Sequence, residues 1–107
     1  MKRHLQLVNV RPEKRAEYLE LHANVWTEIE QRISASNITN YSIFVLGDHL
    51  ASYFEYTGDD FAADMAAMAA DERTQEWWAL TDPCQQPLPD AAAGTLWVDA
   101  VEIWHLA

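Results

Sequence analysis

The sequence has few of the residues that mark several large classes of protein. Its 107 residues include one cysteine, Cys84, so no disulfide can form within the chain. Lysine and arginine total 7 against 17 acidic residues, and the formal net charge is −10. Nucleic acids and anionic membrane surfaces are bound by basic patches, so neither is expected as a partner. A neutral ligand fits this charge best.

The chain also lacks a long hydrophobic run and a glycine-rich loop. No stretch approaches the roughly 20 apolar residues of a membrane span, and the N-terminus lacks the apolar run of a secretory signal. Three glycines in the whole chain leave little room for a phosphate-binding loop. The sequence therefore predicts a soluble, cytoplasmic protein with a single domain over residues 1–107.

Hydrophobic periodicity predicts strands and helices in a recognisable order. They are a strand at 4–10, a helix from about Arg11 to Ile33, strands at 41–46 and 50–56, a helical region over 61–80 in two segments, and a strand at 96–104. The polar segment 34–40 and the proline-containing segment 82–95 are predicted as loops. Gly47-Asp48 predicts a tight hairpin between the two middle strands.

The order strand, helix, strand, strand, helix, strand indicates an α+β fold of the ferredoxin-like βαββαβ type. Two helices cover one face of such a sheet and leave the other face bare. A bare apolar sheet face needs a cover, and a second sheet packed against it would supply one. We therefore expect a homodimer in the form of a dimeric α/β barrel. This fold serves many functions, so the function has to come from the site.

His22 is the leading candidate for chemistry. It belongs to the apolar stripe of the predicted first helix, with Tyr18 four residues before it and Trp26 four residues after it. A histidine with an unperturbed pKa of about 6.5 can both give and take a proton near neutral pH. The same pattern also fits a core histidine that only completes a hydrogen bond.

Aromatic residues provide the second signal, since the chain has 5 tryptophans. Tyr41 opens a predicted strand, and Trp77 and Trp78 lie side by side in the last helical segment. Indole faces suit the C–H patches of a sugar, and phenol or indole hydrogens reach its hydroxyls. These rings could instead fill the core. Adjacent tryptophans in a helix cannot face the same way, so one of the pair is expected to serve a pocket wall or an interface.

Other chemistries have weaker support. The four histidines are scattered, without the close spacing of metal ligands, so no metal site is predicted. Cys84 lies alone in a loop, and a nucleophilic thiol needs a base beside it. We interpret it as an inert small residue.

Several segments together resemble the L-rhamnose mutarotases. They are YLELHANVW with Tyr18, His22 and Trp26, then NYSI at 40–43, QEWWALTDPCQQPLP at 75–89, and the closing VEIWHL. The resemblance keeps its order over nearly the whole chain. It implies a dimeric α/β barrel that interconverts the α and β anomers of L-rhamnose, an isomerase of carbohydrate metabolism. The sequence departs from the family pattern at PDAAAGT, residues 89–95, so no residue of this segment is assigned a role from the resemblance.

The resemblance also implies residue roles. His22 would be the catalytic acid and base, Tyr18 and Tyr41 would contact the sugar, and Trp77 and Trp78 would line the pocket. No cofactor or metal is implied. Related mutarotases of similar shape act on L-fucose, so the preferred 6-deoxy sugar stays open. Two further alternatives are a cofactor-free monooxygenase of the dimeric α/β-barrel type and a binding module without catalysis, in which His22 would be a core residue.

Overall fold

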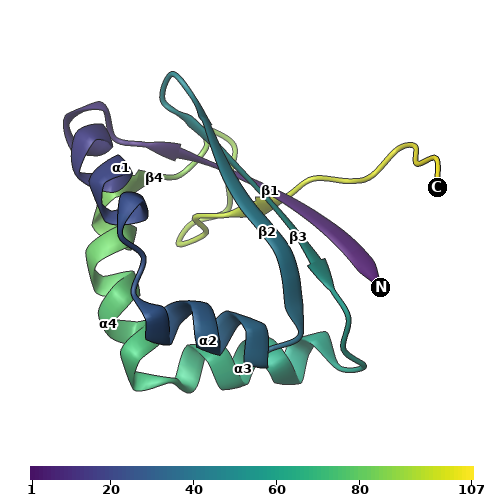
Figure 1. Ribbon diagram of the computed structural model, residues 1–107. Coiled ribbons are helices and arrows are strands. Elements are labelled where there is room, and N and C mark those ends of the chain that lie inside the picture. Colours follow the sequence, from purple (N-terminus) through teal and green to yellow (C-terminus); the bar gives the residue numbers. More distant parts are fainter.

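The computed structural model describes all 107 residues as one curled antiparallel sheet with four helices on one of its faces (Figure 1). The elements are β1 (Lys2–Val10), the 3-10 helix η1 (Pro12–Lys14), α1 (Arg15–Ala23), α2 (Thr27–Ala35), β2 (Ile38–Leu46), β3 (His49–Tyr56), α3 (Phe61–Ala70), α4 (Glu72–Thr81), the 3-10 helix η2 (Asp82–Cys84), β4 (Gln85–Gln86) and β5 (Val98–Asp99). None of the helices is long and apolar enough to cross a membrane.

The strand order confirms the ferredoxin-like prediction. The sheet runs β2-β3-β1-β4, with β5 also paired to β1, and every pair is antiparallel. Leu46 pairs with His49, so the hairpin loop has the two predicted residues, Gly47 and Asp48. Gly47 has φ of 59°, a left-handed conformation that glycine adopts without steric cost.

Alternation of side chains along β1 and β3 separates a helix-covered face from an open face of the sheet. On the covered face, Val8 and Val10 of β1 pack with Leu50 of β3, Tyr18 of α1 and Cys84. A second cluster joins Ile38, Phe54, Tyr56 and Met68. Side chains at the intervening positions, among them Leu5, Leu7, Phe44 and Leu46, point to the open face and are exposed.

The predicted single helix from Arg11 to Ile33 is wrong in one respect. The chain leaves helical geometry after Ala23, and a second helix begins only at Thr27. Trp26 has extended backbone angles, φ −64° and ψ 139°, which take it off the path of a continuous helix. Its ring lies edge-on to Trp77 at 5.1 Å, and this contact between elements accounts for the break.

The two later helices begin where the sequence places them. Asp60 caps α3 by accepting a hydrogen bond from the backbone N–H of Ala63, and Asp71 caps α4 through Thr74. The polar segment 34–40 is not wholly a loop, because α2 runs to Ala35 and β2 starts at Ile38. The segment 82–95 likewise contains η2 and the short strand β4.

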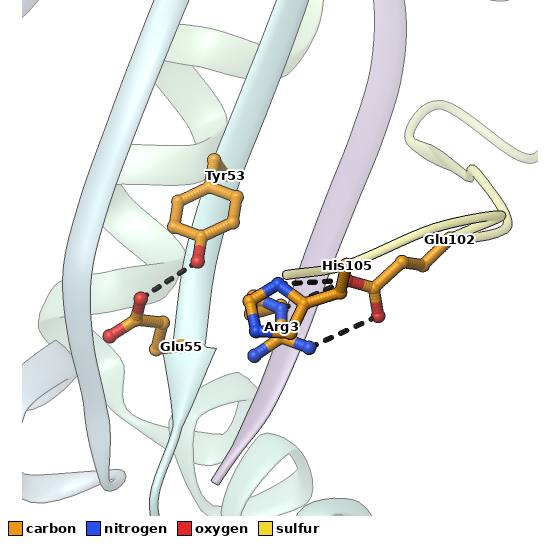
Figure 2. Close-up of polar contacts among 5 residues, drawn as sticks. All are labelled: Arg3, Tyr53, Glu55, Glu102 and His105. Atoms are coloured by element: carbon orange, nitrogen blue, oxygen red, sulfur yellow. Dashed lines mark hydrogen bonds and ion pairs between the residues drawn. The ribbon is translucent and has the colours of Figure 1, made fainter. Parts of the chain in front are cut away.

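The predicted last strand at 96–104 is mostly wrong. Only Val98–Asp99 pairs with β1, and residues 100–107 form an extended tail. Figure 2 shows how this tail is attached: Glu102 accepts a 2.9 Å hydrogen bond from Arg3 and lies 3.8 Å from His105. Tyr53 and Glu55 form a neighbouring pair on β3 (Figure 2). The apolar tail residues find no sheet surface within their own chain, and Ile103 is 95% exposed.

Candidate active site

His22 lies in the last turn of α1, half-buried on the covered side of the sheet. Its Nδ1 is 2.8 Å from the backbone carbonyl oxygen of Tyr18, one helical turn earlier. A carbonyl oxygen only accepts, so Nδ1 carries the hydrogen in this contact. In the neutral ring, Nε2 therefore keeps a lone pair. The helix holds the imidazole in the tautomer that can accept a proton at Nε2.

Tyr18 provides a buried phenol directly beside this imidazole. The two ring centres are 4.3 Å apart, and Tyr18 is 3% exposed. Its hydroxyl accepts a hydrogen bond from Nε2 of Gln85 at 3.3 Å. Burial is the main reason why the pKa of Tyr18 rises to about 12, and the Gln85 contact opposes this rise. The phenol thus keeps its proton at neutral pH and can donate it in a hydrogen bond.

Trp77 contacts the imidazole, and Trp26 packs behind Trp77. Trp77 is 6% exposed and presents an edge-to-face contact to His22 at 5.6 Å. Trp26 packs against Trp77, and the guanidinium of Arg73 lies 3.8 Å from the centre of the Trp26 ring. Trp78 is 37% exposed, and none of these ring contacts involves it. The two adjacent tryptophans thus differ in burial, and Trp77 is the one in contact with His22.

Tyr41 reaches the covered face because β2 is irregular. The register of β2 shifts between Thr39 and Ser42, and Asn40 has φ of 50°. Tyr41 then stacks on Phe54 at 5.6 Å, and although it is 42% exposed, burial of its phenol raises the pKa. The sheet and the helices thus each supply one tyrosine.

Sequence reasoning missed two residues of this group. Gln85 contacts Tyr18 from a segment predicted as a loop, and nothing in the local pattern distinguishes it from Gln86. Arg73 covers Trp26 through a contact between α4 and the link before α2, which chain spacing does not reveal.

Cys84 has the properties of an inert thiol. It is fully buried, and its S–H group donates to the carboxylate of Glu17 at 3.1 Å. Burial, reinforced by Glu17, raises the pKa of the thiol to about 11. The reactive thiolate is therefore scarce at neutral pH. The side chains of the protein form no group of three or more potential metal ligands.

Taken as chemistry, the site combines one proton-transfer group, two protonated phenols and indole surfaces. The hydrogen bonds of His22 and Tyr18 involve no lysine or arginine, and the guanidinium of Arg73 is stacked on Trp26. Such a site suits a neutral ring-shaped ligand with hydroxyl groups on its rim. It offers little to a phosphate or carboxylate, because no lysine or arginine hydrogen-bonds within this group.

Known proteins resemble this chain over most of its length. The family model described as "rhaM: L-rhamnose mutarotase" matches residues 3–106. An L-rhamnose mutarotase of Tolumonas auensis is 30% identical over 101 residues, covering 94% of each chain. An L-fucose mutarotase of Xanthomonas campestris is 34% identical over 86% of this chain and 76% of its own.

A solved structure agrees with the fold. The crystal structure of an L-rhamnose mutarotase from Formosa agariphila is 20% identical, covers 100% of both chains and superposes with a TM-score of 0.78. Together with the match over residues 3–106, these similarities show that the chain belongs to the L-rhamnose mutarotase family, whose members are isomerases acting at the anomeric carbon of a sugar.

Proposed function

We propose that this protein interconverts the α and β anomers of free L-rhamnose, with His22 as the acid and base. The observation that carries the proposal is the position of His22. Its Nδ1 is held by a backbone carbonyl, while its ring is surrounded by Tyr18 and Trp77. This arrangement fixes the ring and keeps Nε2 for proton exchange.

Anomers interconvert by opening and closing the sugar ring. In opening, protonated His22 gives a proton from Nε2 to the ring oxygen, and the anomeric hydroxyl loses its proton to a second group or a water. The bond between C1 and the ring oxygen breaks, and an aldehyde forms at C1. Rotation about C1–C2 presents the other face of the aldehyde. Closure reverses both proton transfers, so His22 regains its proton and no net reaction occurs.

The other residues have binding roles in this proposal. Tyr18 donates a hydrogen bond that orients the sugar, and Tyr41 contacts it from the sheet side. Trp77 provides an apolar wall beside the imidazole. Trp78, implied by the family resemblance, lies on a different side of α4 and would contribute only at the rim. Free sugars already mutarotate in water, so one placed acid and base, contributing on the order of 10² to 10⁴, is sufficient.

The choice of sugar can be tested by binding. L-Rhamnose added to the protein should quench tryptophan fluorescence, because Trp77 and Trp26 adjoin the site. L-Fucose belongs in the same titration, since a relative bearing that sugar's name is 34% identical. Much tighter binding of a phosphorylated sugar would contradict the proposal, because it would require lysine or arginine side chains beside His22 and the tyrosines.

The active assembly in this proposal is a homodimer. The open sheet face carries apolar side chains from β1 and β2, and the tail adds further ones, listed here: Leu5, Leu7, Phe44, Leu46, Val101, Ile103, Trp104 and Leu106. A second copy of the chain presents the same face and the same tail, so each copy can cover the other. Light scattering at micromolar concentration should give about twice the 12.2 kDa chain mass. A clean monomer would contradict the barrel arrangement.

A further inference from the structure

We propose that Gln85 is a positioning residue that sets the direction in which the Tyr18 hydroxyl donates its hydrogen. This inference rests on the proposed function, in which Tyr18 orients the sugar. Gln85 is 4% exposed, and its side chain lies on the covered face opposite Val10 of β1. Its amide nitrogen donates to the Tyr18 hydroxyl oxygen at 3.3 Å.

The direction of this hydrogen bond determines what Tyr18 offers to a ligand. Because Gln85 donates to the phenol oxygen, the hydrogen of the phenol must point elsewhere. No protein group accepts that hydrogen, so it is free for a sugar hydroxyl or ring oxygen. If Gln85 presented its carbonyl instead, it would take the hydrogen and leave Tyr18 only as an acceptor.

The carbonyl oxygen of Gln85 gives the amide a second possible arrangement. This oxygen is buried and has no hydrogen-bond partner in the protein. An unpaired buried acceptor costs stability. If the amide group rotated by half a turn, its oxygen would accept a hydrogen bond from the Tyr18 hydroxyl. A sugar that accepts the Tyr18 hydrogen would favour the donating arrangement, in which the amide nitrogen faces the phenol.

The test is a double-mutant cycle measured on the exchange of L-rhamnose anomers. Gln85→Met keeps the length of the side chain and removes the amide, and Tyr18→Phe removes the hydroxyl. Gln86→Met is the matched control, because Gln86 is the exposed neighbour in the same two-residue strand. Gln85→Glu adds a second probe, since an ionised carboxylate can only accept from Tyr18, whereas a protonated carboxyl can again donate.

Gln85→Met should lower kcat/KM by about threefold to tenfold, the range expected for losing one orienting hydrogen bond. In the Tyr18→Phe background the same change should have no further effect. The rate of Gln85→Glu relative to wild type should rise as the pH falls and the carboxyl becomes protonated, which a merely structural role would not produce. Gln86→Met should match wild type.

The inference would be overturned if folded Gln85→Met had the wild-type kcat/KM. It would also be overturned if Gln85→Met lowered kcat/KM equally in the wild-type and Tyr18→Phe backgrounds. Either result would leave the proposed function unaffected. If Gln85→Met does not fold, a flat ratio of Gln85→Glu to wild type across pH would overturn it. A wild-type protein that fails to accelerate anomer exchange would instead contradict the proposed function, and this inference with it.

Discussion

Replacing Tyr18 by phenylalanine removes one hydroxyl from the most deeply buried side chain of the site and keeps its ring. The ring packs in the core cluster with Val8 and Leu50, so its packing is retained. At neutral pH the loss is confined to the hydrogen bond with Gln85, whose amide is left without an acceptor. Leaving such a buried donor unpaired costs about 1–3 kcal/mol of unfolding free energy.

The pH dependence gives the sharper test. Burial raises the pKa of Tyr18 from 10.0 to about 12, so the folded chain holds this proton more tightly than the unfolded chain. The stability that the proton contributes is complete below the unfolded pKa and is lost as the pH rises above it. With these values, wild type loses about 1.4 kcal/mol through Tyr18 by pH 11, and the loss approaches about 3 kcal/mol beyond pH 12. The Tyr18→Phe variant has no phenol to titrate, so it does not lose this stability.

Urea unfolding of both proteins at pH 7, 9 and 11, followed by circular dichroism, measures this difference. Other groups also titrate in this range, but they are common to both proteins and cancel in the comparison. The stability advantage of wild type over Tyr18→Phe should shrink by about 1.4 kcal/mol between pH 9 and pH 11. A constant difference would show that the Tyr18 hydroxyl is not desolvated, and the description of the site would be wrong.

Three further predictions follow from burial and capping. Because the pKa of the Cys84 thiol is about 11, iodoacetamide at pH 8 should alkylate it at least about 100-fold more slowly than free cysteine. Mass spectrometry follows the reaction, and alkylation at the rate of a free thiol would refute the burial of Cys84. Asp60→Ala should cost about 1 kcal/mol in urea unfolding by removing the cap of α3, whereas Asp60→Asn should cost much less. Trp77→Ala should destabilise the protein by about 3–5 kcal/mol and Trp78→Ala clearly less, and equal losses would contradict their different burial.

Much of the fold could be predicted because its signals are local. The hairpin at Gly47 and the helix start at Asp60 depend on residues that are neighbours in the chain. The break before Thr27 and the end of the last strand at Asp99 could not, because each depends on a surface supplied by another element. Trp26 leaves its helix for Trp77, and the tail leaves the sheet where its apolar residues have no partner within the chain.

The positions of the candidate site residues follow the same rule: those set by local spacing could be predicted, and those set by contacts between elements could not. Helical spacing placed His22 beside Tyr18, and the structure brings their rings to 4.3 Å. The inward turn of Tyr41 depends on an irregularity of β2 that no sequence rule located. Gln85 was missed because a buried glutamine and an exposed one look alike in a loop segment. The roles of these residues stay predictions, and kinetics will decide them.

The central claim is that His22 moves the proton, and exchange NMR on equilibrated L-rhamnose tests it most directly. The anomeric protons report turnover although no net reaction occurs. His22→Ala should retain the fold and lose about 100-fold or more of the enzymatic acceleration. Glu20→Ala is the control, because Glu20 is an exposed residue of the same helix, and this variant should exchange anomers at the wild-type rate. A folded His22→Ala protein that exchanges anomers as fast as wild type would contradict the claim and make His22 a core residue.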